Sequence, residues 1–260
     1  MAISKATAAS IHDLLIEVVR EKLKNYKLET KHMPFHFRLL GRDRYAMFSF
    51  MQSMNTTFGI SVWEQMAVIL ARGAGSRAES QYVLRGEIDP TTEQAIRNIH
   101  YRLRKTEIAP SKHGEVEQIR SMVRQGRELE DPDSRVDVVV QIGKQENYFD
   151  ITSAKPNKKE FVALKLKLLR WTGLRLSQDR DAEVFTRIAI PYNPYHPEPY
   201  ERWTLKGLFD IERDEIMVGA EFWNFVASGN IYEELLDLFE DAGDELRDEI
   251  DERFAELTDQ

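Results

Sequence analysis

Apolar side chains recur with a helical period through the first half of the chain. In residues 9–27, the positions that fall on one helical face are Ile11, Leu14, Leu15, Val18, Val19 and Leu23. Because an amphipathic helix spaces its apolar side chains three or four residues apart, this segment is expected to be a helix. Residues 91–106 and 114–127 are expected to be two more helices with basic faces. The first part of the chain, about residues 1–130, is therefore predicted to be helical.

A shorter helix is predicted over residues 61–73. Ser61 stands at the expected N-cap, Glu64 follows three residues later in a capping-box position, and Gly73 closes the segment. The carboxylate of Glu64 is expected either to cap this helix or to serve a site beyond it, and the two roles are compatible.

The pattern changes after residue 130. Residues 134–143 are rich in β-branched side chains that alternate poorly, as in a strand buried on both faces. Residues 146–154 form a second predicted strand, residues 158–177 a helix and residues 184–193 a third strand. This order, with helices before and after, indicates an α/β core with a mixed central sheet flanked by helices. The cations expected near the exposed side of the 158–177 helix are Lys165, Lys167 and Arg170.

The C-terminal part, about residues 207–260, is predicted to hold an acidic amphipathic pair of helices that breaks near Gly243. These helices are expected to pack onto the body of the protein or onto a partner subunit. We therefore expect a single domain. Its catalytic α/β core is expected at about residues 131–206, together with helix 61–73. The helical part at about 1–130 and the acidic part at about 207–260 are expected to flank this core.

Composition and charge narrow the classes of protein. The chain of 260 residues has 42% hydrophobic residues, no cysteine and a net charge of −8. The absence of cysteine excludes disulfides, Cys-zinc sites and thiol catalysis and fits a cytoplasmic protein. The sequence has no membrane-spanning apolar run, no H-E-x-x-H zinc motif and no phosphate-binding G-x-x-x-x-G-K loop, so neither a membrane nor a nucleotide cofactor is expected.

The charge is unevenly distributed along the chain. Residues 1–206 carry 33 Lys and Arg against 26 Asp and Glu, whereas residues 207–260 carry 3 against 18. A mildly basic body is compatible with DNA binding, while the acidic end points away from DNA or contacts another subunit.

Two acidic residues fall on adjoining predicted strands. Asp137 begins the first strand and Asp150 lies in the second, and a short connection lets both carboxylates meet at one sheet edge. Taken singly, each is more simply a solvated strand start or an acid near a turn. Together with Glu64, they indicate a Mg²⁺ site, because Mg²⁺ accepts a few carboxylates and keeps several waters. A site of this kind favours phosphodiester hydrolysis, since the metal neutralises phosphate oxygens and lowers the pKa of bound water.

The cation of such a site is harder to assign. In "YFDITSAKPNKKEF" (148–161), Thr152 stands where a lysine would normally follow Asp150. On a regular strand the Lys155 side chain faces away from the side of Asp150, but Pro156 favours a bend that brings Lys155 toward Asp150. We expect Lys155 to supply the cation, with the helix-start lysines Lys158 and Lys159 as alternatives.

Several long stretches extend this interpretation. The stretches are "PFHFRLLGRDRYAMFSFMQSMNTTFGISVWEQMA" (34–67), "YFDITSAKPNKKEF" (148–161), "IAIPYNPYHPEPYERWTLKGLFD" (188–210) and "GAEFWNFVASGNIYEELLDLFEDAG" (219–243). They resemble the type II restriction endonucleases typified by TdeIII, and the D-x12-D-x-T spacing looks like a variant of the PD-(D/E)xK nuclease signature. The resemblance implies a PD-(D/E)xK nuclease-like fold and Mg²⁺-dependent double-strand cleavage at short palindromic DNA sites, GGNCC-like and including GGWCC.

Carried over by position, the resemblance makes Asp137, Asp150 and Glu64 the metal-binding and catalytic acids. Val136 replaces the proline that the signature nominally places before the first aspartate, and Thr152 replaces its lysine. The palindromic site implies a homodimer, because a two-fold DNA site is mirrored by a two-fold protein.

Two loops are candidates for DNA contacts. The segment "RLLGRDR" (38–44) is expected either to contact DNA or to be a solvated loop. The proline-rich segment at 190–203 is expected either to contact DNA or to be a structural loop that packs on the sheet. The residues expected to contact DNA are Arg38, Arg42, Arg44, Lys158, Lys159, Tyr192, Asn193 and Arg202.

Two other functions stay open on sequence grounds. One is a DNA-binding protein on a nuclease-like fold that has lost catalysis, which Thr152 favours. The other is a non-catalytic helical interaction protein whose acidic end recruits partners. The main expectation is a restriction endonuclease of a restriction-modification system.

Overall fold

The computed structural model describes residues 2–27, 33–131, 134–202 and 204–258, without the side chains of residues 42, 43, 60, 61, 257 and 258. The strands are β1 (Arg77–Val83), β2 (Arg135–Ile142), β3 (Gln145–Ile151), β4 (Glu183–Ile190) and β5 (Ile216–Val218). The helices are α1 (Lys5–Asn25), α2 (Pro34–Leu40), α3 (Arg42–Thr57), α4 (Trp63–Gly73), α5 (Pro90–Arg104), α6 (Lys112–Met122), α7 (Lys158–Gln178), α8 (Ala220–Val226), α9 (Tyr232–Glu245) and α10 (Arg247–Thr258).

The five strands form one mixed sheet in the order β1-β2-β3-β4-β5. The first three strands pair antiparallel, and β3, β4 and β5 pair parallel. The predicted α/β core with a mixed sheet flanked by helices is therefore confirmed. Strands β1 and β5 were not predicted, because β1 carries mainly polar residues and β5 is only three residues long.

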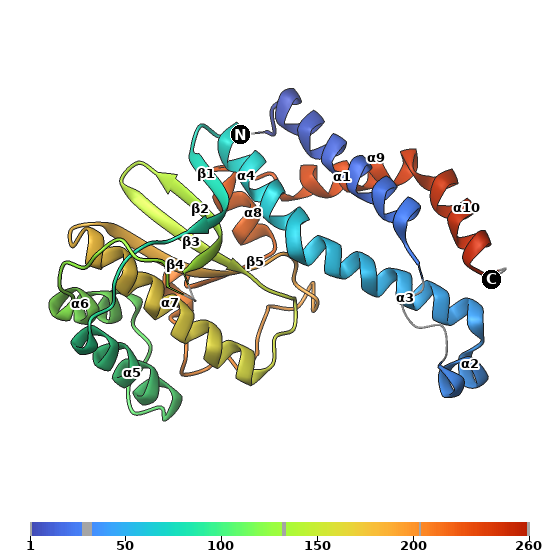
Figure 1. Ribbon diagram of the computed structural model, residues 1–260. Coiled ribbons are helices and arrows are strands. Elements are labelled where there is room, and N and C mark those ends of the chain that lie inside the picture. Colours follow the sequence, from blue (N-terminus) through green and yellow to red (C-terminus); the bar gives the residue numbers. More distant parts are fainter. Residues whose placement is uncertain (1, 28–32, 132–133, 203, 259–260) are drawn as a thin grey trace.

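Helices cover both faces of the sheet (Figure 1). One hydrophobic core joins α5, α6 and α7 to the sheet through residues such as Ile96, Ile119 and Trp171. The other core joins α1, α4, α8 and α9 to the opposite face through residues such as Ile11 and Met66. The sheet is therefore buried on both sides over β3 and β4, as the apolar middle of the sequence predicts.

The hairpin between β2 and β3 is closed by two residues, with Gly143 in a left-handed conformation at φ 62°. Such two-residue turns need positive φ, which glycine adopts without a steric cost. The register that follows pairs Ile142 with Gln145 and Val138 with Phe149.

Helix α4 does not start with a cap at Ser61, so this prediction is wrong. A π-helical turn, Phe58–Val62, joins α3 to α4 without a break, and the Trp63 N–H donates to the Phe58 carbonyl. Glu64 therefore lies inside a longer helical run and has no capping role. Its side chain is bound by Gln81 instead.

The α2–α3 segment extends away from the sheet, beside α1 and α10 (Figure 1). A small third core that includes Leu23, Phe50 and Met54 joins α1 to α3. The acidic helices pack on the body as predicted: Arg20 on α1 forms ion pairs with Glu245 and Glu249. Their break falls at the buried Leu246, close to Gly243, which lies in the last turn of α9.

The cations of α7 do not share one environment. Lys165 is fully buried, so its predicted place on the exposed side is wrong. Its Nζ atom lies 2.7 Å from Oε2 of Glu115 and 2.7 Å from Oε1 of Glu215. Lys112 completes the group, with its Nζ atom 3.2 Å from the same Glu215 oxygen. Two buried lysines thus balance two buried glutamates between α6, α7 and the segment before β5.

None of the helices in the described part of the chain is long and apolar enough to cross a membrane.

Candidate active site

The strand register brings Asp137 and Asp150 together. Val138 is paired with Phe149 in the antiparallel β2–β3 ladder, and the next position of the same register pairs Asp137 with Asp150. Cross-strand neighbours on one face of a sheet have Cβ atoms about 5 Å apart. Oδ2 of Asp137 accepts a hydrogen bond from the Ile151 N–H at 2.7 Å, which holds this carboxylate at the end of β3.

A lysine from α7 contacts the second aspartate. The Nζ atom of Lys167 forms an ion pair with Oδ2 of Asp150, whose residue is only 5% exposed. The same ammonium lies 4.9 Å from the centre of the Trp171 ring, one helical turn further along α7. An ammonium between a carboxylate and an aromatic face is held in place on both sides.

Glu64 is the third acid of this region. It is also 5% exposed, and Gln81 Nε2 donates to its two oxygens at 2.8 Å each. Burial raises the pKa of Glu64, and the charge of Asp150 raises that pKa further, whereas the hydrogen bonds from Gln81 and the charge of Lys167 lower it. Glu64 is therefore close enough to interact electrostatically with both Asp150 and Lys167.

The pKa of Asp137 is strongly raised. Burial, followed by the charge of Asp150, raises its pKa to about 7, with a smaller contribution in the same direction from Glu64. The Ile151 N–H and the Lys167 charge act in the opposite direction. Carboxylates that raise one another's pKa form a site where a cation is favourable, because the cation removes their repulsion.

The lysine predicted for this site lies elsewhere. The Nζ atom of Lys155 lies 4.9 Å from the centre of the Tyr195 ring. Thr152 continues the pairing of β3 with β4, since its N–H donates to the Ala189 carbonyl at 2.9 Å. The structure thus places Lys167, and not Lys155, against Asp150. No local pattern marked Lys167, because its position depends on how α7 crosses the sheet.

The oxygen atoms at this site suit a hard divalent cation such as Mg²⁺. Within the described residues, hydrogen bonds and ion pairs engage only Oδ2 of each aspartate, so Oδ1 of Asp137 and of Asp150 stay available as ligands. No three His, Asp or Glu side chains in the described part of the chain are placed to share one ion. The arrangement therefore fits a cation held by the aspartate pair, with water completing its shell and Glu64 outside.

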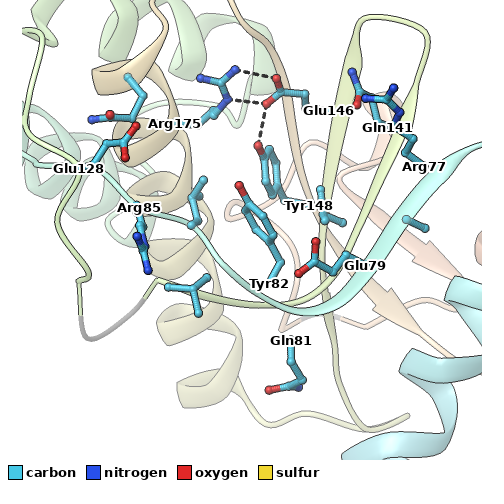
Figure 2. Close-up of a pocket in the computed structure, with 15 residues that line it drawn as sticks. Arg77, Glu79, Gln81, Tyr82, Arg85, Glu128, Gln141, Glu146, Tyr148 and Arg175 are labelled. Atoms are coloured by element: carbon cyan, nitrogen blue, oxygen red, sulfur yellow. Dashed lines mark hydrogen bonds and ion pairs between the residues drawn. The ribbon is translucent and has the colours of Figure 1, made fainter.

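A hollow of about 740 Å³ opens on the same face of the sheet (Figure 2). Val139, Gln141, Glu146 and Tyr148, which lie two and four residues from the aspartates on the same face of β2 and β3, line it. Gln81 lies at one end, whereas the ion pair between Arg175 and Glu146 lies at the other (Figure 2). The hollow thus begins one cross-strand pair away from Asp137 and Asp150.

The predicted DNA contacts fall into two groups. Arg38 and Arg44 are exposed on α2 and α3, and Arg44 Nη1 donates to the Leu40 carbonyl at 2.9 Å. Helix α2 lies away from strands β2 and β3, at the far end of α3 (Figure 1). The side chain of Arg42 lies outside the described residues. The structure does not bring Arg38 or Arg44 to the carboxylates.

The second group lies near the end of β3. Lys158 and Lys159 are exposed in the first turn of α7. The proline-rich loop that carries Tyr192, Asn193 and Arg202 packs beside the connection from β3 to α7, because the Tyr200 hydroxyl donates to the Ala154 carbonyl at 3.0 Å. The loop is thus both structural and adjacent to the candidate active site.

Comparison with known proteins identifies the family of this chain. The sequence profile of the type II restriction endonuclease family HinfI matches residues 3–243. Two type II restriction enzymes from Herpetosiphon aurantiacus, HgiEI and HgiBI, are each 25% identical over 94% of this chain and 95% of their own length. A third, HgiCII from the same organism, is 26% identical over 81% of this chain and 77% of its own. The chain belongs to the HinfI family of type II restriction endonucleases, which are site-specific deoxyribonucleases.

Proposed function

We propose that this endonuclease cleaves both strands of DNA in a Mg²⁺-dependent reaction at a PD-(D/E)xK-type site. The observation that carries the proposal is the cross-strand pair of Asp137 and Asp150, with Lys167 bound to Asp150 and Glu64 close by. Mg²⁺ held by the two aspartates would neutralise phosphate oxygens and lower the pKa of bound water. The assignment of the site to Asp137, Asp150 and Glu64 follows from this arrangement.

The protein side chains then have separate tasks. Asp137 and Asp150 present hard oxygen atoms on one face of the sheet. Glu64 adds negative charge from the side of α4 and can orient water in the outer shell of the cation. The ammonium of Lys167 can hold a water molecule beside the scissile phosphate or offset charge that develops on it.

We assign the lysine role to Lys167 in place of Lys155. Its contact with Asp150 and its anchoring on Trp171 support this choice. Lys155, Lys158 and Lys159 surround the start of α7, and we propose that they contact the DNA backbone there, together with Tyr192, Asn193 and Arg202 of the adjoining loop. Arg38, Arg42 and Arg44 are proposed to contact DNA further from the cut.

For the recognised sequence, we propose a short palindrome of the GGNCC or GGWCC kind. The support is the resemblance of four long stretches of this chain to TdeIII-like enzymes. The proposed location is the cytoplasm, where a restriction-modification system acts on incoming DNA.

We propose a homodimer, because a two-fold protein matches a palindromic site. The α2–α3 segment offers a surface for such a partner, since six large apolar side chains are exposed on it: Phe35, Leu39, Leu40, Met47, Phe48 and Met51. Large exposed apolar patches mark interaction surfaces in soluble proteins. Sedimentation equilibrium of the parent and of Phe48→Glu tests this: a dimer that the variant weakens is expected, and a monomeric parent contradicts it.

The function as a whole is tested by digestion of DNA of known sequence with Mg²⁺ and by mapping of the ends. Discrete fragments with ends at one short palindrome are expected. A smear would indicate a non-specific nuclease. Salt-sensitive DNA binding without cleavage in Mg²⁺ or Mn²⁺ would instead support a nuclease-fold protein that has lost catalysis.

A further inference from the structure

The pairing of strand β1 with β2 skips one residue beside the candidate active site. Ser80 is paired with Val138 and Tyr82 with Val136, so Gln81 lies opposite Asp137 between them, but it takes no regular place in the ladder. Its φ is 53°, in the left-handed region that residues with a Cβ atom rarely adopt. Conformations of this kind persist only where the surroundings hold them, and they gather at functional sites.

The side chain of Gln81 explains what this conformation achieves. Its Nε2 atom lies 2.8 Å from both carboxylate oxygens of Glu64, a residue of α4, which packs against β1. Its Oε1 atom accepts from Arg135 Nη1 at 3.4 Å. Because Arg135 can only donate, it fixes the amide with its NH₂ group toward Glu64. In the part of the chain that the structure describes, Gln81 supplies both hydrogen bonds that Glu64 accepts.

A neutral donor is well suited to this place. Glu64 is buried and interacts unfavourably with the charge of Asp150, so its carboxylate needs hydrogen bonds to stay ionised and oriented. A lysine or arginine at position 81 would satisfy the same oxygens, but its positive charge would repel a divalent cation between the acids. The amide of glutamine binds the carboxylate without adding charge.

We propose that Gln81 is a positioning residue, which holds Glu64 in the orientation that supports a divalent cation at Asp137 and Asp150. This inference rests on the proposed metal-dependent function. It assigns to Gln81 an indirect role, because Gln81 contacts Glu64 and not the aspartates. Partners in the outer shell of a metal site change metal affinity by about 10- to 100-fold when they are mutated.

The test is titration of the full-length protein with Mn²⁺ in the absence of DNA, followed by calorimetry or by the electron paramagnetic resonance signal of free Mn²⁺. Gln81→Leu, which removes the donor, and Gln81→Lys, which adds a charge, are each expected to weaken Mn²⁺ binding by about 10-fold or more. Gln141→Leu is the matched control, because Gln141 lines the same hollow and donates only to the Gly143 carbonyl among the described residues. The control is expected to bind Mn²⁺ like the parent.

The variant Gln81→Gly separates the effect of the glutamine side chain from the effect of the backbone conformation. Glycine adopts positive φ freely, so this variant relieves the backbone while it removes the donor, and it is expected to bind Mn²⁺ as weakly as Gln81→Leu. If the Gln81 variants bind Mn²⁺ as the parent does, or if Gln141→Leu loses as much affinity, the positioning role is wrong. If the parent itself neither binds Mn²⁺ nor cleaves DNA, the proposed metal-dependent function is wrong. That outcome is distinguishable from a failure of the positioning role, in which the parent still binds Mn²⁺.

Discussion

Lys167 in the middle of α7 forms an ion pair with Asp150 near the end of β3, so the ammonium group of this candidate site comes from a helix and not from the strand that carries Asp150. The strand position that would carry the lysine is Thr152. A helix that crosses the sheet can supply the same group at the same place, because only the position of the charge matters for electrostatic stabilisation.

The first prediction concerns this lysine. Lys167→Ala is expected to lower the single-turnover cleavage rate by on the order of 100-fold or more, while DNA affinity in Ca²⁺ stays within a few-fold of the parent. Lys155→Ala serves as the comparison: it is expected to weaken DNA binding, because it removes a proposed backbone contact, but to keep a single-turnover rate close to the parental one when the enzyme saturates the DNA. Loss of cleavage in Lys155→Ala with normal cleavage in Lys167→Ala would return the role to the residue that the sequence favoured.

The second prediction concerns Asp150. Asp150→Ala is expected to abolish cleavage and to retain or tighten DNA binding, because it removes a negative charge that faces the phosphates. Gel-shift and cleavage assays on the same DNA measure both properties. Parental cleavage by this variant would show that Asp150 does not act in the reaction.

The third prediction follows from the raised pKa of Asp137. Its pKa is raised to about 7 in the folded protein, mainly by burial and then by Asp150, and lies near 4 in an unfolded chain. Between these values the folded state binds more protons, so the stability that the protonated carboxyl contributes is lost as the pH rises through about 7. Metal-free Asp137→Asn is therefore expected to exceed the parent in free energy of unfolding at about pH 8, by at least about 1 kcal/mol.

Near pH 4 the same variant and the parent are expected to differ little in stability, since the parental carboxyl is then protonated in the folded state and about half protonated in the unfolded chain. Asp181→Asn, at an exposed turn, is the control and is expected to follow the parent at every pH. Denaturant titrations across this pH range measure the difference. Stability curves of Asp137→Asn and parent that run parallel from pH 4 to pH 8 would contradict the prediction.

The fourth prediction concerns the buried charges that fix α7. Lys165→Met is expected to lower the free energy of unfolding by about 3–5 kcal/mol, because it leaves Glu115 and Glu215 without their shared cation. Arg97→Ala removes an exposed ion pair to Glu93 and is expected to cost less than about 1 kcal/mol. If the two variants lower the free energy of unfolding by the same amount, the buried ion pairs of Lys165 add little to the stability of the fold.

The hairpin of β2 and β3 is a part of the fold that could be predicted from the sequence. Asp137 and Asp150 could be paired from the sequence because the connection between their strands is short and contains Gly143, so the register follows from local geometry. The predicted helix 158–177 likewise matches α7, Lys158–Gln178, to within one residue at each end. The α/β class followed from the order of these elements.

Long-range placement was beyond the sequence. Strand β1 is a polar edge strand, and Gln81 on it meets Glu64 only after β1 pairs with β2 and α4 packs on both. Helix α4 was predicted with a start at Ser61, but tertiary packing continues it into α3. Lys165 looked exposed by its charge, and only its encounter with Glu115 and Glu215 made burial favourable.

The sequence by itself therefore determined the acidic pair and the strands that carry it, because both depend on contacts between residues close along the chain. The tertiary structure alone decided which lysine meets Asp150 and which side chain holds Glu64. Those contacts join elements far apart in the sequence, and their geometry depends on how α4 and α7 pack against the whole sheet.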